Sequence, residues 1–329
     1  MPPLPHFGEA RAACITLLVD NRADLLLKSG ETVKYFHEAP LLAEHGFSAL
    51  LDVNHGQRRI LWDAGASSIA LIENMQRMQI DHRSLHTIAL SHGHFDHIAA
   101  LSQILREMDL APRYREWQPG ASPQEMQAWA EGDGIPLVMH PAAQRERWRR
   151  ADDGRMFGPS QPPPVSEWQA LGARLILSES PYPLAPGCWT TGYIPRRSFE
   201  TAGRDPGRRF YREGSEFKPD DIEDDQAIVI HLQDKGLIVL SGCAHAGILN
   251  TVRHAQNISG VEQVHAILGG FHLAPASPQD LQRTIQEIQA LHPQIVAPCH
   301  CTGLTAEAAL ARRMPEQFVE AVVGVTYEF

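Results

Sequence analysis

The chain has 329 residues and 43% of them are hydrophobic, so it can bury a sizeable core and is not expected to be disordered. Its formal net charge of −10 argues against a general affinity for nucleic acid or for an anionic membrane surface. No window approaches the roughly 18 consecutive apolar residues of a membrane span, and the N-terminus lacks a secretion-signal pattern. Five cysteines in a chain of this length indicate reduced thiols rather than a disulfide framework. We therefore expect a cytoplasmic protein without a membrane or nucleic-acid partner.

Short β-rich segments open the chain. Residues 14–21, 47–53 and 58–63 have the composition and flanking turn residues of strands. Apolar residues at helical spacing predict an amphipathic helix over 68–80, and the apolar run 87–90 predicts a buried strand. Alternating strands and helices of this kind indicate a layered α/β domain.

The middle of the chain is more polar. Residues 134–140 predict a strand, 142–150 a charged helix, and the Pro/Gly-rich residues 154–164 a surface loop. We expect a single domain over residues 1–329, with an insertion around residues 111–165.

Residues 198–218 mix glycine with arginine and have no apolar period. Two interpretations stay open for this segment. It is either a solvated mobile loop or a lid that supplies arginine side chains to an anionic substrate. In the second case Arg208 and Arg209 would bind the substrate.

The last third of the chain repeats one arrangement, in which a strand leads to a histidine and then to a helix. A β-hairpin is predicted around residues 233–235, and helices are predicted over 247–255 and after Ser277. The strand ends carry these side chains: Cys243 and His245 after 236–240, His272 after 264–268, and His300 after 295–297. Since active sites of α/β folds lie at the carboxyl ends of strands, we expect these side chains to gather.

The most informative stretch is His92-Gly93-His94-Phe95-Asp96-His97, which follows the predicted strand 87–90. His92 and His94 have alternate spacing and can converge on one point. Asp96 and His97 lie where a helical pattern starts, so they can face a second point nearby. Imidazole with carboxylate is the ligand set expected for zinc, and for iron or manganese when oxygen ligands dominate. The stretch therefore predicts two divalent transition-metal ions, with zinc as the first choice.

This pattern resembles the H-x-H-x-D-H signature of the metallo-β-lactamase superfamily. Other segments match the same family in the right order: 44–48, 60–65, 224–227, 242–247, 269–272 and 298–303. Together they resemble one branch, usually described as similar to 7,8-dihydropterin-6-yl-methyl-4-(β-D-ribofuranosyl)aminobenzene 5′-phosphate synthase. The resemblance implies a four-layer αββα sandwich with a dinuclear metal centre at one edge.

A first metal held by His92 and His94 needs a third ligand, and we predict His245, which also follows a buried strand. Many members of the superfamily have a bridging aspartate at a comparable strand end, where this chain has Cys243. Three interpretations are open. Cys243 binds as a thiolate, or the bridge is lost and His245 takes over, or the cysteine is a small packing residue.

Asp96, His97 and His300 would form the second metal site, with water or hydroxide between the two ions. The resemblance implies that Asp63 forms hydrogen bonds to residues 92–97, called the metal loop below, without binding metal itself. For His272 four roles are open: a ligand, a proton shuttle, a substrate contact or a structural histidine.

This constellation predicts a metal-dependent hydrolase in which a metal-activated water attacks an ester or phosphodiester. Asp96 would orient the water and His272 would protonate the leaving group. The resemblance implies a phosphorylated or pterin-like small-molecule substrate, and the arginines suit an anionic one. Two alternatives remain. One is the pterin-linked synthase step, and the other is a metal or thiol redox or sensing protein that depends on Cys243, Cys299 and Cys301.

Overall fold

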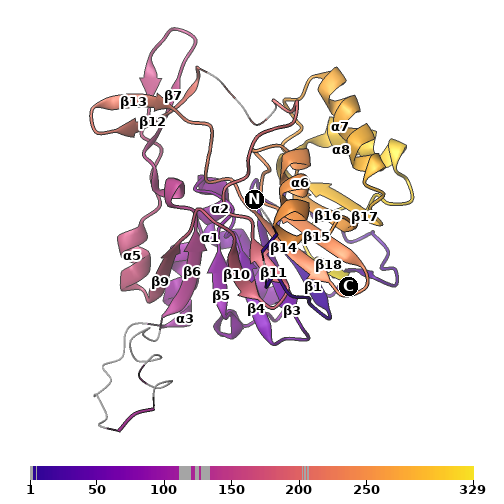
Figure 1. Ribbon diagram of the computed structural model, residues 1–329. Coiled ribbons are helices and arrows are strands. Elements are labelled where there is room, and N and C mark those ends of the chain that lie inside the picture. Colours follow the sequence, from indigo (N-terminus) through magenta and orange to yellow (C-terminus); the bar gives the residue numbers. More distant parts are fainter. Residues whose placement is uncertain are drawn as a thin grey trace.

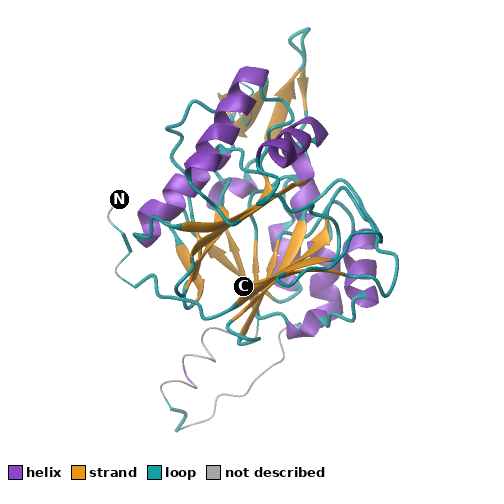
Figure 2. Cartoon of the chain, turned by 90° about the vertical axis from the view of Figure 1, so that its right-hand side faces the viewer, coloured by secondary structure: helices purple, strands orange, loops and turns teal. Residues whose placement is uncertain are grey.

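Two large β-sheets face each other in the computed structural model of the chain, and helices cover both outer faces (Figure 1). Figure 2 shows the strands in the middle with helices on either side. The structure describes residues 3–4, 6–110, 120–122, 126, 134–201, 203, 205 and 207–329. The layer order of helix, sheet, sheet and helix confirms the predicted αββα sandwich.

The first sheet has eight strands in the order β2-β18-β1-β3-β4-β5-β6-β9. In that order they span Val33–Tyr35, Val325–Glu328, Ala13–Val19, Ser48–Val53, Arg58–Trp62, Thr87–Ala89, Ile135–Met139 and Ala173–Leu177. Neighbouring strands from β4 to β9 in this order run parallel. The expected strands of the first half of the chain are all present in this sheet.

The second sheet has six strands in the order β10-β11-β14-β15-β16-β17. In that order they span Tyr182–Ala185, Cys188–Thr190, Ala227–Leu232, Gly236–Ser241, Val264–Gly270 and Ile295–Cys299. β14 and β15 form the predicted hairpin, and β15, β16 and β17 run parallel.

Each sheet has its own set of helices. The helices on the side of the first sheet are α1 (Ser68–Arg77), α2 (Phe95–Ile98), α3 (Leu101–Met108) and α5 (Val165–Ala170), with the 3₁₀ turns η1 (His82–Ser84) and η2 (Pro141–Gln144). Those on the side of the second sheet are α6 (Ile248–Ser259), α7 (Pro278–Ala290) and α8 (Leu304–Arg313), with the 3₁₀ turn η3 (His300–Thr302). No helix in the described part of the chain has both the length and the apolar character needed to cross a bilayer.

The central strands have apolar side chains on both faces. In β4, Leu61 packs beneath the helices and Trp62 packs between the sheets, and both are 0% exposed. In β14, Ile228 packs between the sheets and Val229 packs beneath the helices. Successive strand residues point to opposite faces, and each buried side chain of this size contributes about 1.5–3 kcal/mol. This arrangement explains why these strands are continuous apolar runs in the sequence.

A separate four-stranded sheet, in the order β13-β12-β7-β8, projects from the main body (Figure 1). It combines β7 (Arg147–Arg150) and β8 (Met156–Phe157) with β12 (Arg209–Glu213) and β13 (Glu216–Pro219). The charged helix predicted over 142–150 is therefore wrong, because pairing of β7 with β12 overrides local helix propensity. Most of 209–219 is a hairpin rather than a loop, with a two-residue turn in which Gly214 has φ +60°. The insertion predicted around residues 111–165 lies partly outside the described residues, and its described part includes β6, which belongs to the eight-stranded sheet.

The carboxyl ends of five strands lie at one edge of the sandwich and carry the residues singled out by the sequence. β4 leads to Asp63 and β5 leads to the loop that contains His92 and His94. The strands β15, β16 and β17 lead to the remaining site residues: Cys243, His245, His272 and His300. Parallel pairing of these strands brings segments far apart in the sequence to the same edge.

Candidate metal centre

The backbone turns sharply at several of these strand ends. Asp63, Ala244, His272 and His300 have φ values of +61°, +53°, +48° and +51°. Left-handed backbone at a residue with a side chain costs of the order of 1–3 kcal/mol and tends to gather at functional sites. Here the strained residues coincide with the edge where the histidines meet.

The first ligand group contains His92, Cys243 and His245, whose donor atoms all lie within 4.8 Å of one another. The ring of His245 lies 4.9 Å from that of His92 and 5.0 Å from that of His94, measured between centroids. His94 Nδ1 lies 2.8 Å from His92 Nε2. The predicted set of His92, His94 and His245 is therefore together, and the Cys243 thiol lies beside it.

The second ligand group contains His97, Cys243 and His300, again with donor atoms within 4.8 Å of one another. Asp96 Oδ2 lies 3.5 Å from His300 Nε2 and 3.9 Å from His97 Nε2. The same Oδ2 is 3.4 Å from Nε2 of His45, an exposed residue for which the sequence suggested no role. Cys243 thus belongs to both candidate ligand groups.

Asp63 holds the metal loop from behind. Its Oδ1 accepts a hydrogen bond from Ser91 N at 2.7 Å, and its Oδ2 lies 2.7 Å from His97 Nδ1. Ser91 Oγ donates to the same Oδ2 at 2.6 Å. A Cβ at Gly242 would lie 2.2 Å from Ser91 Oγ, so only glycine fits beside this network. These hydrogen bonds join Asp63 to the histidine stretch, and its role as an orienting residue stays a prediction.

The protonation states differ between the histidines. Burial lowers the pKa of His92, His94, His245 and His300 well below the usual value, so these rings are neutral at neutral pH and ready to bind metal. Burial also disfavours a charged His97, but the Asp63 and Asp96 carboxylates outweigh this effect and raise its pKa to about 9. A metal bound at His97 must therefore displace a proton.

A second support reaches the metal loop from the four-stranded sheet. The Asp224 carboxylate accepts a hydrogen bond from Gly93 N at 2.8 Å and pairs with Arg147. Arg147 Nε also pairs with Asp220 Oδ2 at 2.8 Å. A Cβ at Gly93 would lie 2.2 Å from Ala143 O, which explains the glycine between the two histidines. Sequence reasoning missed Arg147, because only the paired strands reveal that it points inward.

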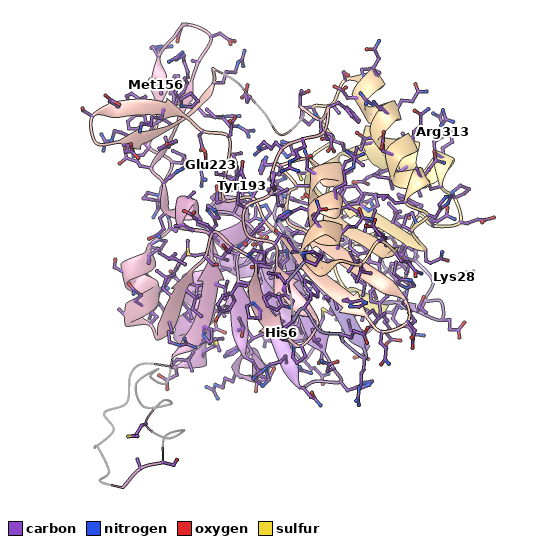
Figure 3. All side chains as sticks on the ribbon, viewed as in Figure 1. His6, Lys28, Met156, Tyr193, Glu223 and Arg313 are labelled. Carbon is purple, nitrogen blue, oxygen red and sulfur yellow. The ribbon has the colours of Figure 1, made fainter. Side chains whose placement is uncertain are left out.

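A cavity of about 380 Å³ opens beside His94 and Asp96. Its other lining residues come mostly from the four-stranded sheet and neighbouring segments: Gly93, Phe95, Arg145, Arg147, Trp148, Arg149, Ser160, Gln161, Pro162, Pro163, Arg209 and Asp220. Arg145 pairs with Glu223, which Figure 3 shows between this sheet and the main body. Arg149 is 3.8 Å from Asp205, whereas Arg209 has no carboxylate within ion-pair distance among the described residues.

The two arginines predicted to bind substrate have different positions. Arg209 lines the cavity and its guanidinium donates to Gly203 O at 3.3 Å. Arg208 pairs with Asp152 on the surface, with 58% of its side chain exposed, and is not part of the lining. Arg209 is therefore better placed than Arg208 to contact a substrate in the cavity.

The donor set fits metal ions. Both ring nitrogens of His245, Nε2 of His300 and Nδ1 of His272 are buried without a hydrogen-bond partner in the described part of the chain. An unpaired buried polar group costs about 1–3 kcal/mol, which coordination to a metal would offset. Thiolate and imidazole are common zinc ligands.

Comparison with known proteins supports metal binding by this chain. The model of the metallo-β-lactamase superfamily matches residues 43–254, more than half of the chain. The chain belongs to the metallo-β-lactamase superfamily. Membership implies that the protein binds metal ions, and it supports an enzyme that acts on a small molecule.

Two relatives of this chain come from Methanocaldococcus jannaschii. A 7,8-dihydropterin-6-methyl-4-(beta-D-ribofuranosyl)-aminobenzene-5′-phosphate synthase is 29% identical over 296 residues, 89% of this chain and 92% of the relative. Uncharacterized protein MJ0448 is 30% identical over 310 residues, 94% of this chain and 98% of the relative. The solved structure of Tm1679, a metal-dependent hydrolase of the β-lactamase superfamily, has a TM-score of 0.67 at 21% identity and covers 96% of this chain and 99% of its own. That likeness confirms the fold.

Proposed function

We propose that this protein is a metal-dependent hydrolase that cleaves an ester or phosphodiester bond in an anionic small molecule. The observation that carries the proposal is the arginine-lined cavity, which opens directly beside His94 and Asp96. His94 lies 2.8 Å from His92 of the first candidate ligand group, and Asp96 lies 3.5 Å from His300 of the second. A substrate in the cavity would thus place its reacting bond next to the metal ligands.

In this proposal His92, His94 and His245 would hold one ion, and Asp96, His97 and His300 would hold the other, with Cys243 shared between them. Two bound zinc ions would supply an activated water and stabilise the negative charge that develops during attack. The thiol and the five imidazoles favour zinc over iron or manganese, which prefer more oxygen ligands.

Three residues would act on the reactants: Asp96, which would also bind the second ion, His272 and Arg209. Asp96 lies at the boundary between the cavity and the ligand groups, so it is placed to orient the attacking water. His272 lies 4.2 Å from His245 between ring centroids and would protonate the leaving group. Arg209, without a carboxylate partner among the described residues, would pair with the anionic group of the substrate.

Metal content and turnover test the proposal together. His92→Ala should remove one ion and nearly all hydrolysis of a responsive substrate from a panel of phosphodiesters, phosphate esters and lactones. Metal analysis of the purified protein and of a metal-reconstituted sample measures the first effect. Absence of a bound transition metal from both samples would refute the proposal.

The two neighbouring arginines provide a matched test of the anionic substrate. Arg209→Ala should raise the KM for a phosphorylated ester about 10-fold or more, because a hydrogen bond to a charged group is worth about 1.5–3 kcal/mol. The KM for a neutral ester should change much less. Arg208→Ala, which alters the surface pair with Asp152, should leave both KM values close to wild type. Equal effects of the two variants would contradict the assigned role of Arg209.

The relative named as a synthase favours a second candidate, a transfer step that joins two substrates. Isotopically labelled water distinguishes the two reactions. Hydrolysis incorporates the labelled oxygen into a product, whereas a transfer between two organic substrates does not. Mass spectrometry of the products therefore decides between them.

A further inference from the structure

Two thiols and one imidazole that follow three neighbouring strands form another group beside the proposed centre. Cys243 follows β15, His272 follows β16, and Cys301 follows β17. Their donor atoms all lie within 4.8 Å of one another. The Cys301 thiol donates to Cys243 O at 3.4 Å, which places the two cysteines side by side.

The backbone leaves room for the Cys301 side chain. A Cβ at Gly270 would lie 2.8 Å from Cys301 Sγ and 2.2 Å from Gly242 O, so any larger residue would force the strands apart or displace the thiol. Gly270 is the last residue of β16, between the strands that carry the two cysteines. The close approach of the sulfur atoms thus depends on glycine at this position.

The two cysteines that flank His300 are not equivalent. Cys299 is buried in the core between the sheets, where it packs in the same cluster as Ala297 and Tyr327. Cys301 is partly exposed and groups with Cys243 and His272 instead. Only one thiol of this C-x-C sequence therefore faces the ligand groups.

His272 completes the set. Its backbone is in the left-handed region at φ +48°, and its Nδ1 is buried without a hydrogen-bond partner in the described part of the chain. Two thiols and one imidazole are typical ligands of zinc, cadmium and other thiophilic ions. The first and second ligand groups each contain a single sulfur, that of Cys243, and the Asp96 carboxylate lies near His300 of the second group.

We propose that Cys243, His272 and Cys301 form a third metal-binding position, which takes a soft, thiophilic ion. It extends the proposed metal centre and shares Cys243 with both ligand groups described above. An ion at this position would compete for the Cys243 thiolate, so a soft metal in excess would displace the ions of the proposed centre. This inference gives His272 the role of a ligand whenever the third position is filled.

Titration of the chelator-treated full chain with Cd²⁺ tests this position. Bound cadmium gives an ultraviolet thiolate charge-transfer band whose intensity reports the number of coordinating sulfurs. Cys301→Ala should reduce the band of the fully titrated protein to about half, because one of two thiolates is lost. Cys299→Ala, one position before His300, is the matched control and should leave the band unchanged. A band of wild-type intensity in Cys301→Ala would overturn the inference.

Thiol alkylation of the wild-type protein gives a second readout that needs no variant. Cys301 and Cys14 are both partly exposed, but Cys14 lies on β1, away from the ligand groups. Added Cd²⁺ should slow labelling of Cys301 by iodoacetamide and leave Cys14 unaffected, as measured by peptide mass spectrometry. Equal labelling of Cys301 with and without Cd²⁺ would also overturn the inference. Zinc content tests the two-ion centre separately, because Cys301→Ala should keep both zinc ions whatever the cadmium experiments show. Loss of zinc from the wild-type protein would refute the proposed centre, whereas an unchanged cadmium band in Cys301→Ala would refute only the third position.

Discussion

Replacement of Cys243 is the most informative single perturbation of the proposed centre, because its sulfur lies within 4.8 Å of the donors of both ligand groups. Cys243→Ser changes the volume little and removes a thiolate that both ions would share. Loss of an orienting partner alone typically costs 10–100-fold in metal affinity, so we expect loss of a shared ligand to cost about 100-fold or more at each position. At about 1.4 kcal/mol per tenfold change, this is about 2.8 kcal/mol for each ion.

Competition with a chelator measures the two affinities, and Co²⁺ substitution reports the sulfur directly. The thiolate charge-transfer band of the cobalt protein should disappear in Cys243→Ser. Two single-site controls give a contrasting pattern. His245→Ala should weaken mainly the first ion, and His300→Ala should weaken mainly the second, whereas Cys243→Ser should weaken both.

Two results would refute this reasoning. Unchanged affinities together with an unchanged cobalt spectrum would mean that Cys243 only packs, as one interpretation of the sequence holds. A loss confined to one ion would mean that the sulfur binds but does not bridge. Either outcome would move the shared position to another ligand, with Asp96 next in line because it lies within 4 Å of two histidines of the second group.

Two further predictions concern the residues that support the metal loop. Asp63→Asn should lower metal affinity at the His97 position about 10–100-fold, since the ring loses its orienting carboxylate, and chelator competition should detect this loss without an equal change at the first ion. Arg147→Met should reduce the free energy of unfolding by about 3–5 kcal/mol, because two buried carboxylates lose their partner. In denaturant unfolding, Arg155→Met at the exposed pair with Asp153 should cost less than about 1 kcal/mol, and comparable losses for both arginine variants would contradict the assigned role of Arg147.

The sequence was sufficient to predict the main body of the fold and the residues that gather at its edge. Strands buried on both faces are continuous apolar runs, and the metal loop directly follows one of them. Parallel strands end at the same edge, so histidines that follow separate strands could be expected to meet. The placement of His245 beside His92 follows from this rule.

The four-stranded sheet was harder to predict, because its strands pair residues far apart in the sequence and carry many charges. The many charged residues around Arg147 suggest that its side chain faces solvent. In the structure Arg147, on β7, is instead buried between two carboxylates. One local signal was available, the Gly214-Ser215 pair between two short β-rich runs, which is typical of a two-residue hairpin turn. No local signal indicates that β7 pairs with β12, so the cavity that this sheet lines could not be predicted.

The metal preference of the proposed centre depends on which residue type supplies the ligand that both ions would share. A bridging aspartate offers two hard oxygen atoms, whereas Cys243 offers one soft sulfur. The same sulfur also lies beside His272 and Cys301, so the substitution changes three donor sets together. Since affinity for thiolate falls from zinc and cadmium to manganese, we expect the centre to discriminate strongly against manganese. The single change from a Gly-Asp step to Gly242-Cys243 would therefore set the metal preference of the whole site.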